Sequence, residues 1–338
     1  MSRRAVLVCP GRGTYNRNEL GSLKRTGGAY EELTELFDNI RRREQQLTVS
    51  ELDGSDRFSS RLHMRSDNAS ALIYACSYTD YLNIDDHALE IVAVTGNSMG
   101  WYTALACAGA LSPEDGFELV NTMGSLMQSG GVGGQLIYPC TDIDWVANHQ
   151  RERAILDRVT EIDGSADQVL KVSIRLGSMI VLAGNEAGLR AFEKAVPVIG
   201  DRFPMRLPNH AAFHTSLLSP VADEARLQLA NLPLQPTSLP LVDGHGSLWY
   251  PHCYERDQLW DYTLGRQVTE TYDFTTALRI AAFEFEPDMF VVLGPGRTLR
   301  QSVAQCLVAA GWRDLEDRNA FEKRQAEEAI VVGTELVS

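Results

Sequence analysis

The residues of this chain that most clearly suggest chemistry are Gly96-Asn97-Ser98-Met99-Gly100. An apolar run typical of a β-strand begins at Ile91 before them, and residues 101–110 follow with a helical pattern. A glycine-x-serine-x-glycine sequence between a strand and a helix is typical of a nucleophile elbow, which exposes the serine hydroxyl. Nearby amides and the helix N-terminus can stabilise an oxyanion there. Isolated copies of this motif also occur in surface turns, but the flanking elements favour Ser98 as the nucleophile of an acyl transfer.

The other residue types that often carry chemistry show no metal-binding pattern. The histidines lack the H-E-x-x-H motif and any paired ligand spacing, so we expect no metal site. The six cysteines are scattered, mostly in apolar segments, which is typical of free thiols in a reducing compartment. Only residues 5–9 are apolar near the basic N-terminus, too few for a signal sequence or a membrane span. We therefore expect a cytoplasmic protein.

Composition sets the size of the fold and the kind of partner. A chain of 338 residues that is 44% hydrophobic can hold one large domain with an insertion, or two domains. Its formal net charge of −14 argues against nucleic acids and anionic membranes as partners. A local basic patch for an anionic ligand is still compatible with that charge.

The segments around the elbow predict an α/β domain. Residues 5–9 form a short buried strand that leads into the loop Pro10-Gly11-Arg12-Gly13. A helix begins at Ser112, with Pro113 in its first turn, and its apolar face carries Met123. A second strand–turn–helix, residues 289–309, contains Gly294-Pro295-Gly296. This turn could hold a phosphate at the helix N-terminus, or it could be purely structural.

The order of predicted strands and helices changes after the glycine cluster at 130–134, which predicts a second structural unit. Residues 134–140 form a strand and 143–162 a helix, and 168–175 and 178–183 form two more strands. A helix at 185–195 and a strand near 202–207 complete a βαββαβ order, which is ferredoxin-like. We predict a large α/β-hydrolase-like domain with a parallel-sheet core, residues 1–131 and 208–338. The ferredoxin-like subdomain, residues 132–207, is inserted in it.

Five motifs in this order resemble the malonyl-CoA:acyl-carrier-protein transacylases and the acyltransferase domains of polyketide synthases. The motifs are Pro10-Gly-Arg-Gly13, Gly96-Asn-Ser-Met-Gly100, the helix at 102–111, Ala212-Phe-His-Thr-Ser-Leu-Leu-Ser-Pro220 and Gly294-Pro-Gly296. The resemblance covers roughly residues 5–309.

The resemblance implies Ser98 as nucleophile and His214 as its general base. His210, four residues upstream, is a rival base, or a surface histidine in the loop after Pro208-Asn209. It also implies an oxyanion hole formed by the backbone amides of Arg12 and Met99. An acyl group would pass from acyl-CoA to Ser98 and then to the phosphopantetheine thiol of an acyl carrier protein. No permanently bound cofactor is implied, and we expect a monomer.

Several positions depart from the pattern of these enzymes. Met123 stands where they carry the arginine that binds the malonyl carboxylate, and a thioether cannot replace a guanidinium. Phe213 is of the type associated with small, unbranched acyl groups, and Trp101 predicts a bulkier, more apolar pocket wall. These residues predict that a neutral acyl group is preferred, unless Arg12 or Arg175 supplies a cation from another direction. Alternatively, Arg12 reaches solvent or a CoA phosphate.

The group that orients the histidine also differs. Asp273 aligns with the glutamine segment that supports the histidine in these enzymes, so it could complete a Ser–His–Asp triad or be a solvated turn residue. The sequence predicts an acyl-CoA:acyl-carrier-protein S-acyltransferase. An acyl-thioester hydrolase of the same fold is the alternative, and a non-catalytic carrier-docking protein is disfavoured by the intact Ser98 and His214.

Overall fold

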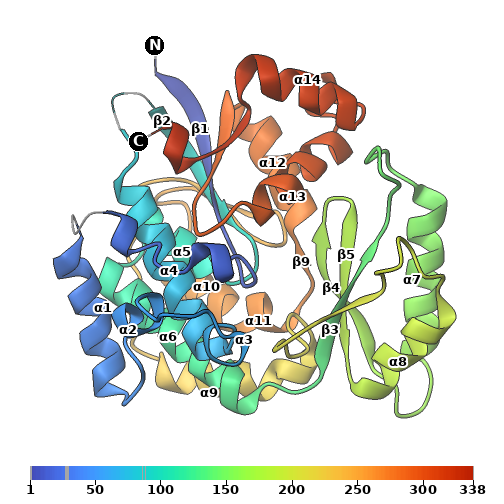
Figure 1. Ribbon diagram of the computed structural model, residues 1–338, viewed down its shortest axis with the longest axis horizontal. Coiled ribbons are helices and arrows are strands. Elements are labelled where there is room, and N and C mark those ends of the chain that lie inside the picture. Colours follow the sequence, from blue (N-terminus) through green and yellow to red (C-terminus); the bar gives the residue numbers. More distant parts are fainter. Residues whose placement is uncertain (1, 27–29, 86, 88, 338) are drawn as a thin grey trace.

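The computed structural model describes residues 2–26, 30–85, 87 and 89–337. Its larger part is built on a six-stranded sheet in which the strands follow the order β11-β10-β1-β2-β7-β8 (Figure 1). Neighbouring strands are parallel except for the β7–β8 pair. The strands are β1 (Arg3–Cys9), β2 (Leu89–Gly96), β7 (Leu241–Val242), β8 (Leu248–Trp249), β10 (Met289–Val292) and β11 (Val331–Gly333).

The centre of this sheet is β1, whose five residues from Ala5 to Cys9 are all fully buried. A parallel strand covered on both faces has this continuous apolar sequence. Cys9 is level with Gly96 of β2, and Val8 with Val292 of β10. The loops that follow these three strands therefore lie at one edge of the sheet, where α/β proteins commonly place their sites.

Helices cover the large sheet, with α4, α5 and α6 on one side and α12 and α13 on the other (Figure 1). The N-cap side chain of Ser112 accepts a hydrogen bond from the Asp115 amide at the start of α6, as the sequence predicted. The helices are α1 (Glu31–Arg43), α2 (Val49–Asp53), α3 (Ser60–His63), α4 (Ser66–Leu82), α5 (Gly100–Cys107), α6 (Pro113–Gly130), α9 (Ser219–Gln228), α10 (Arg256–Asp261), α11 (Gln267–Thr269), α12 (Phe274–Phe285), α13 (Thr298–Ala309) and α14 (Arg318–Glu328).

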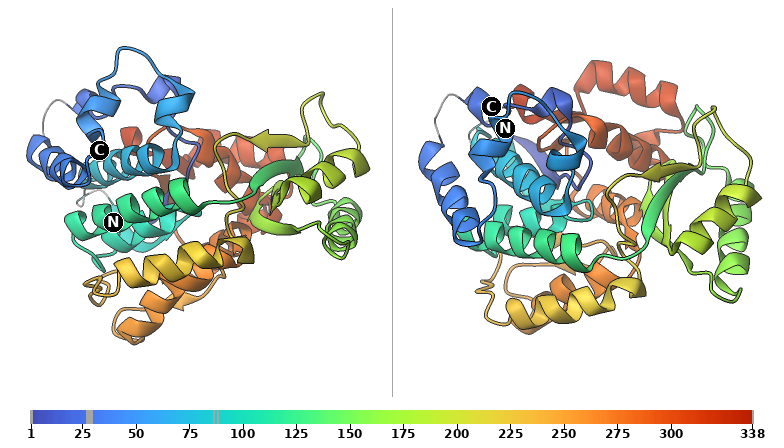
Figure 2. Two further views of the ribbon diagram at one scale, coloured as in Figure 1. Left: turned by 90° about the horizontal axis from the view of Figure 1, so that it is seen from below. Right: turned by 60° about the horizontal axis from the view of Figure 1, so that its bottom comes forward.

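A smaller sheet stands beside the large one, and α7 and α8 cover its outer face (Figures 1 and 2). Its strand order is β6-β3-β5-β4-β9, and all neighbours are antiparallel except β4 and β9. A separate apolar core lies between this sheet and its helices. The elements are β3 (Gly134–Pro139), α7 (His149–Asp163), β4 (Leu170–Leu176), β5 (Met179–Gly184), α8 (Glu186–Ala195), β6 (Met205–Leu207) and β9 (Tyr272–Asp273).

The predicted βαββαβ order is the order observed from β3 to β6. Two details differ. Helix α7 begins at His149 rather than near residue 143, because Asn148 is the side chain that caps it. Strand β9, from the later part of the chain, extends the small sheet and ties it to the large domain. The predicted boundaries at residues 131 and 207 remain predictions.

Candidate active site

Ser98 lies in a strained turn between β2 and α5. Its φ angle is 55°, in the left-handed region that non-glycine residues seldom adopt. Strain of this kind costs about 1–3 kcal/mol and persists only where the surrounding structure enforces it. Here the Asn97 amide donates to the Cys9 carbonyl (2.9 Å), and the Gly100 amide donates to the Asn97 carbonyl (2.9 Å). The elbow is therefore tied to the end of the central strand.

The two glycines of the motif are required by close backbone contacts. A Cβ atom on Gly100 would lie 2.1 Å from the Cys9 carbonyl oxygen, and one on Gly96 would lie 2.3 Å from the Gly100 carbonyl carbon. Neither space admits a methyl group. The motif is thus a tight elbow here, as the sequence predicted, rather than a surface turn.

His214 is placed directly at the serine. Its Nε2 atom is 2.7 Å from Ser98 Oγ, and its Nδ1 atom is 2.7 Å from the backbone carbonyl oxygen of Gln267. A carbonyl can only accept, so Nδ1 carries the proton and donates to it. Nε2 is then the acceptor for the serine hydroxyl, which is the tautomer that a general base needs.

Of the two roles that the sequence left open for Asp273, the structure does not show the triad carboxylate, because His214 Nδ1 lies against the Gln267 carbonyl. The Asp273 carboxylate caps α12 by accepting from the Thr276 amide (2.8 Å), and it lies 3.8 Å from Arg175. Helix N-termini attract carboxylates for this purpose. The orienting group that the sequence analysis missed is Gln267, which stands earlier in the same segment and acts through its main chain.

Gln267 also connects the histidine to the elbow through its side chain. Its Nε2 donates to the Ser98 carbonyl (3.0 Å), and its Oε1 accepts from the Tyr102 hydroxyl (2.9 Å). One residue therefore orients His214 with its carbonyl and holds the serine turn with its amide. A glutamine fits this position because it offers both a donor and an acceptor.

Burial controls the protonation of His214. Removal from water lowers the pKa of this imidazole to about 4, and the charge of His245 acts in the same direction. The hydrogen bond to Gln267 works against this shift without reversing it. The imidazole is consequently neutral at pH 7, ready to accept a proton.

The rival base His210 lies in a different network. Its Nδ1 atom is 2.6 Å from Gln135 Oε1, and Gln135 Nε2 donates to Ser173 Oγ (2.6 Å). Ser173 in turn donates to the carbonyl of Phe213 (2.7 Å). This chain anchors the loop before His214 to β3 and β4 of the small sheet. His210 therefore holds the loop, whereas His214 reaches the serine.

The cavity beside Ser98 is small, with a volume of about 40 Å³. A cavity needs roughly 10–15 Å³ of probe-occupied space to hold one water molecule, so the space suits a small group. The lining residues are Arg12, Ser66, Ser70, Ser98, Met99, Tyr102, Val120, Met123, Gly124, Met127, Phe213, His214, Gln267 and Val268. Met123 and Phe213 thus line the cavity, as the sequence predicted, and α6 supplies its apolar wall.

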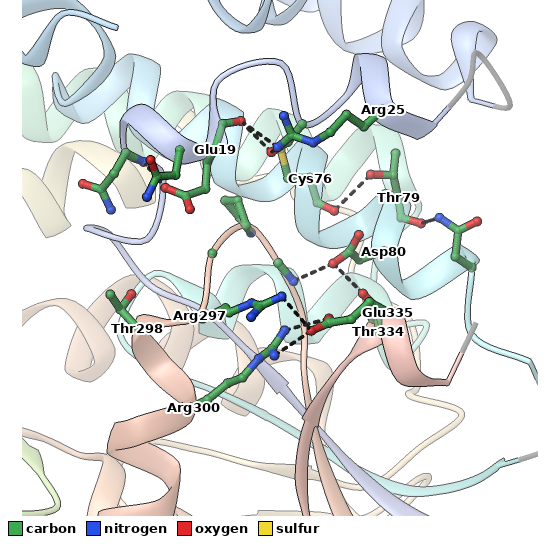
Figure 3. Close-up of a pocket in the computed structure, with 17 residues that line it drawn as sticks. Glu19, Arg25, Cys76, Thr79, Asp80, Arg297, Thr298, Arg300, Thr334 and Glu335 are labelled. Carbon is green, nitrogen blue, oxygen red and sulfur yellow. Dashed lines mark hydrogen bonds and ion pairs between the residues drawn. The ribbon is translucent and has the colours of Figure 1, made fainter. Parts of the chain in front are cut away.

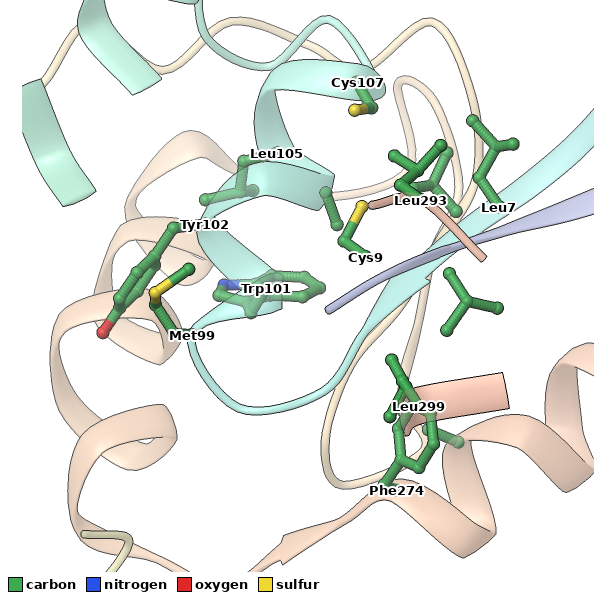
Figure 4. Packing of buried hydrophobic residues seen from close by; sticks show 14 of the residues in the cluster. Leu7, Cys9, Met99, Trp101, Tyr102, Leu105, Cys107, Phe274, Leu293 and Leu299 are labelled. Carbon is green, nitrogen blue, oxygen red and sulfur yellow. The ribbon is translucent and has the colours of Figure 1, made fainter. Parts of the chain in front are cut away.

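Trp101 is not a wall of this cavity. It is fully buried in the large core (Figure 4). Its Nε1 donates to Thr263 Oγ1 (3.0 Å), and its ring packs edge-on against Tyr262. Residues two apart on a helix point in nearly opposite directions. Met99 lines the cavity, so Trp101 faces away from it.

Arg175 does not supply the missing cation either. It lies in β4, where its Nη1 atom is 2.5 Å from Glu152 Oε1 of α7. It lines a separate cavity with Cys140 and Asp273. The ion pair with Glu152 accounts for its position, and this partner could not be seen from the sequence around residue 175.

Comparison with known proteins agrees with this geometry. No protein-family model matches the chain. Over 194 residues it is 27% identical to a non-reducing polyketide synthase of Aspergillus novofumigatus, covering 57% of this chain and 8% of that protein. Over 209 residues it is 24% identical to a malonyl CoA-acyl carrier protein transacylase of Salmonella typhimurium, covering 61% of this chain and 63% of that enzyme. The matches thus span less than two thirds of either relative.

A solved structure supports the fold over the full length. An acyl-carrier-protein S-malonyltransferase of Burkholderia pseudomallei 1710b superposes with a TM-score of 0.73 at 21% identity, covering 96% of this chain and 99% of that one. The chain is similar to malonyl transacylases. The resemblance inferred from the five motifs is confirmed by these relatives, and the α/β fold class by the superposition.

A much larger cavity lies apart from the Ser98 cavity. It has a volume of about 1220 Å³ and surrounds the Gly294-Pro295-Gly296 turn (Figure 3). The Gly294 amide donates to Asp80 Oδ2 (2.8 Å), and Arg300 donates two hydrogen bonds of 2.7 Å to Glu335. The carboxylates of Asp80 and Glu335 already accept from these donors and would disfavour an anion beside them, so this turn is better explained as structural than as a phosphate site.

Two further findings concern the described residues. No group of three or more histidine, cysteine, aspartate or glutamate side chains there could hold a metal ion. None of the helices in this part of the chain is long and apolar enough to cross a bilayer.

Proposed function

We propose that this protein is an acyl-CoA:acyl-carrier-protein S-acyltransferase that works through an acyl-Ser98 ester. The observation that carries the proposal is the 2.7 Å contact between Ser98 Oγ and His214 Nε2, with Nδ1 held on the Gln267 carbonyl. The nucleophile, its base and the group that orients the base are therefore connected by successive hydrogen bonds. The names of the Salmonella and Burkholderia proteins, which both include an acyl carrier protein, support the choice of acceptor.

The first half-reaction loads the enzyme. Ser98 Oγ attacks the thioester carbonyl while its proton moves to His214 Nε2. We propose that the amides of Arg12 and Met99 bind the resulting oxyanion, since both stand in the turns that meet at this edge of the sheet. The tetrahedral intermediate collapses, the carbon–sulfur bond breaks, and the CoA sulfur takes the proton from His214.

The second half-reaction unloads it. The thiol of a carrier-bound phosphopantetheine gives its proton to His214 and attacks the Ser98 ester. When this intermediate collapses, the bond between Ser98 Oγ and the acyl carbon breaks, His214 returns the proton to Ser98, and the carrier protein leaves with the acyl group on its thiol. Both steps use the same base, which alternates between acceptor and donor. The small cavity favours a short acyl chain.

The test follows the fate of the acyl group. The protein is incubated with short-chain acyl-CoAs and then with a phosphopantetheinylated carrier protein, and both proteins are analysed by intact-mass spectrometry. We expect an acyl adduct on the enzyme that moves to the carrier. An adduct that is released as free acid at the same rate with and without carrier would indicate the hydrolase. The absence of any adduct would contradict the proposal.

A further inference from the structure

The guanidinium of Arg12 is held at the Ser98 cavity by two main-chain contacts. Its Nη2 donates to the carbonyls of Met64 (3.1 Å) and Asn209 (2.8 Å). The ring of Phe213 lies 5.1 Å from the guanidinium carbon. These contacts come from two separate segments, the loop at Met64 and the loop from Asn209 to Phe213, so the position of the charge is fixed from more than one side.

The rest of the guanidinium has no partner. Arg12 Nε and Nη1 are buried and make no hydrogen bond within the described part of the chain. Buried donors without acceptors are rare, because each costs about 1–3 kcal/mol and more on a charged group. Each such group calls for an explanation, and a ligand acceptor is one.

The charge itself is maintained. Burial lowers the pKa of Arg12 to about 10, which leaves it a cation at neutral pH. Asp67 is the carboxylate that acts on it, but Asp67 is paired with Arg65 at 3.0 Å. The cavity thus contains a cation whose nearest anion is engaged elsewhere.

The opposite wall explains what the cation could bind. Val120, Met123 and Met127 of α6 offer no charge. Since His214 is neutral, Arg12 is the only cationic side chain among the described residues that line the cavity. An anionic acceptor in this small space would satisfy the free N–H groups by charge-assisted hydrogen bonds. A neutral methyl group would leave them unpaired.

We propose that Arg12 binds the free carboxylate of a dicarboxylic acyl group on Ser98, from the oxyanion loop rather than from α6. This inference rests on the proposed function. It reverses the preference for a neutral acyl group that Met123 suggests in the sequence, because Arg12 supplies the cation that position 123 lacks. Arg12 is then a specificity-determining residue. The competing explanation is that Arg12 has only a structural role, in which it links the carbonyls of Met64 and Asn209.

The experiment compares kcat/KM for malonyl-CoA and acetyl-CoA in the wild-type protein, Arg12→Gln and the matched control Arg175→Gln. We expect the wild type to prefer malonyl-CoA. Arg12→Gln should lower the ratio of kcat/KM for malonyl-CoA to kcat/KM for acetyl-CoA about ten- to a hundredfold. Arg175→Gln should leave the ratio of the two unchanged, since Arg175 pairs with Glu152 outside the cavity.

A measurement on the wild type alone guards against misfolding of the variant. Malonamoyl-CoA, in which an amide replaces the carboxylate, should react about ten- to a hundredfold more slowly than malonyl-CoA. Equal reactivity of the two, a wild-type preference for acetyl-CoA, or an equal loss with both substrates in a folded Arg12→Gln would overturn the inference. Failure of the wild type to form an acyl-enzyme with any of these thioesters would instead overturn the proposed function.

Discussion

Two strand–turn–helix units flank the central strand β1 and end at the same edge of the large sheet. One joins β2 to α5 through Ser98, and the other joins β10 to α13 through Gly294-Pro295-Gly296. Both turns are too tight for a side chain: a Cβ atom would lie 2.1 Å from a carbonyl oxygen at Gly100 and 2.5 Å from one at Gly296. Local architecture therefore does not distinguish them.

The difference lies in which side chains the two turns bring together. At the second turn, Asp80 and Glu335 already pair with the neighbouring donors, although the cavity there has a volume of about 1220 Å³. At the first turn, the cavity is only about 40 Å³. It nevertheless contains the Ser98 hydroxyl, hydrogen-bonded to the neutral imidazole of His214, and the Arg12 guanidinium with its unpaired N–H groups. Arg300 Nε at the second turn is also buried without a partner among the described residues, so an unpaired donor alone does not distinguish the two turns. The contact between a serine hydroxyl and a neutral imidazole, not cavity size, indicates where the chemistry is.

The largest effect should come from His214→Ala. General-base catalysis contributes typically 10²–10⁴-fold, so kcat/KM for acyl transfer should fall by about that much. His252→Ala, at an exposed position, serves as the matched control and should leave kcat/KM for acyl transfer unchanged. A larger loss in His210→Ala than in His214→Ala would mean that the base has been assigned to the wrong histidine.

Gly100→Ala should have the largest effect on stability. The new methyl group collides with the Cys9 carbonyl, and overpacking of this kind costs about 3 kcal/mol. Gly164→Ala is the control, because its Cβ would meet no atom closer than 3.4 Å and should change the free energy of unfolding by less than about 1 kcal/mol. Urea unfolding measures both. Equal stabilities would show that the elbow is looser than described.

The pH dependence of acylation should follow the neutral form of His214. Burial lowers the pKa of His214 to about 4, so the imidazole remains neutral and active as the pH falls below the ordinary value of about 6.5. The rate should be lost only at more acidic pH, by protonation of the base. The measurement is kcat/KM for acyl-CoA against pH in the free enzyme. An acid limb centred at 6.5 or above would contradict a buried base.

Asp273→Asn should have little effect on the chemistry. The Gln267 carbonyl accepts the Nδ1 proton, and asparagine caps a helix as well as aspartate does. We expect kcat/KM within about threefold of the wild type, whereas loss of a true triad carboxylate costs about 10⁴-fold. A loss approaching that size in a folded variant would show that Asp273 does act as the triad carboxylate.

The smallest effect is expected at the second turn. Arg297 is 80% exposed there and should not bind substrate. Arg297→Gln should leave both kcat and KM for acyl-CoA within about twofold. A large rise in KM alone would show that this turn does bind a phosphate, the alternative that its glycine-rich sequence left open.

The features that could be predicted from the sequence are those encoded locally. The Ser98 elbow, the N-cap at Ser112 and the alternation of the βαββαβ segment each depend on neighbouring residues. The sequence could not choose between the two roles of Asp273, because the group that orients His214 is a main-chain carbonyl, which no side-chain pattern reveals. Trp101 was misplaced because the phase of α5 at the elbow decides which residues face the cavity.

The remaining differences arise from partners distant in the sequence. Arg175 is held by Glu152, and the free N–H groups of Arg12 become visible only when Met64, Asn209 and Phe213 surround it. Whether a charged side chain is paired is a property of the folded chain. The sequence could therefore name both arginines as candidates, but it could not choose between them.

The most direct test of the account is to locate the acyl ester on the protein. Wild-type protein and Ser98→Ala are each mixed with malonyl-CoA, quenched in acid, digested and mapped by mass spectrometry. The account predicts a malonyl adduct on the peptide containing Ser98 in the wild type and none in the variant. An adduct that persists in Ser98→Ala, on another serine or on a cysteine, would contradict it.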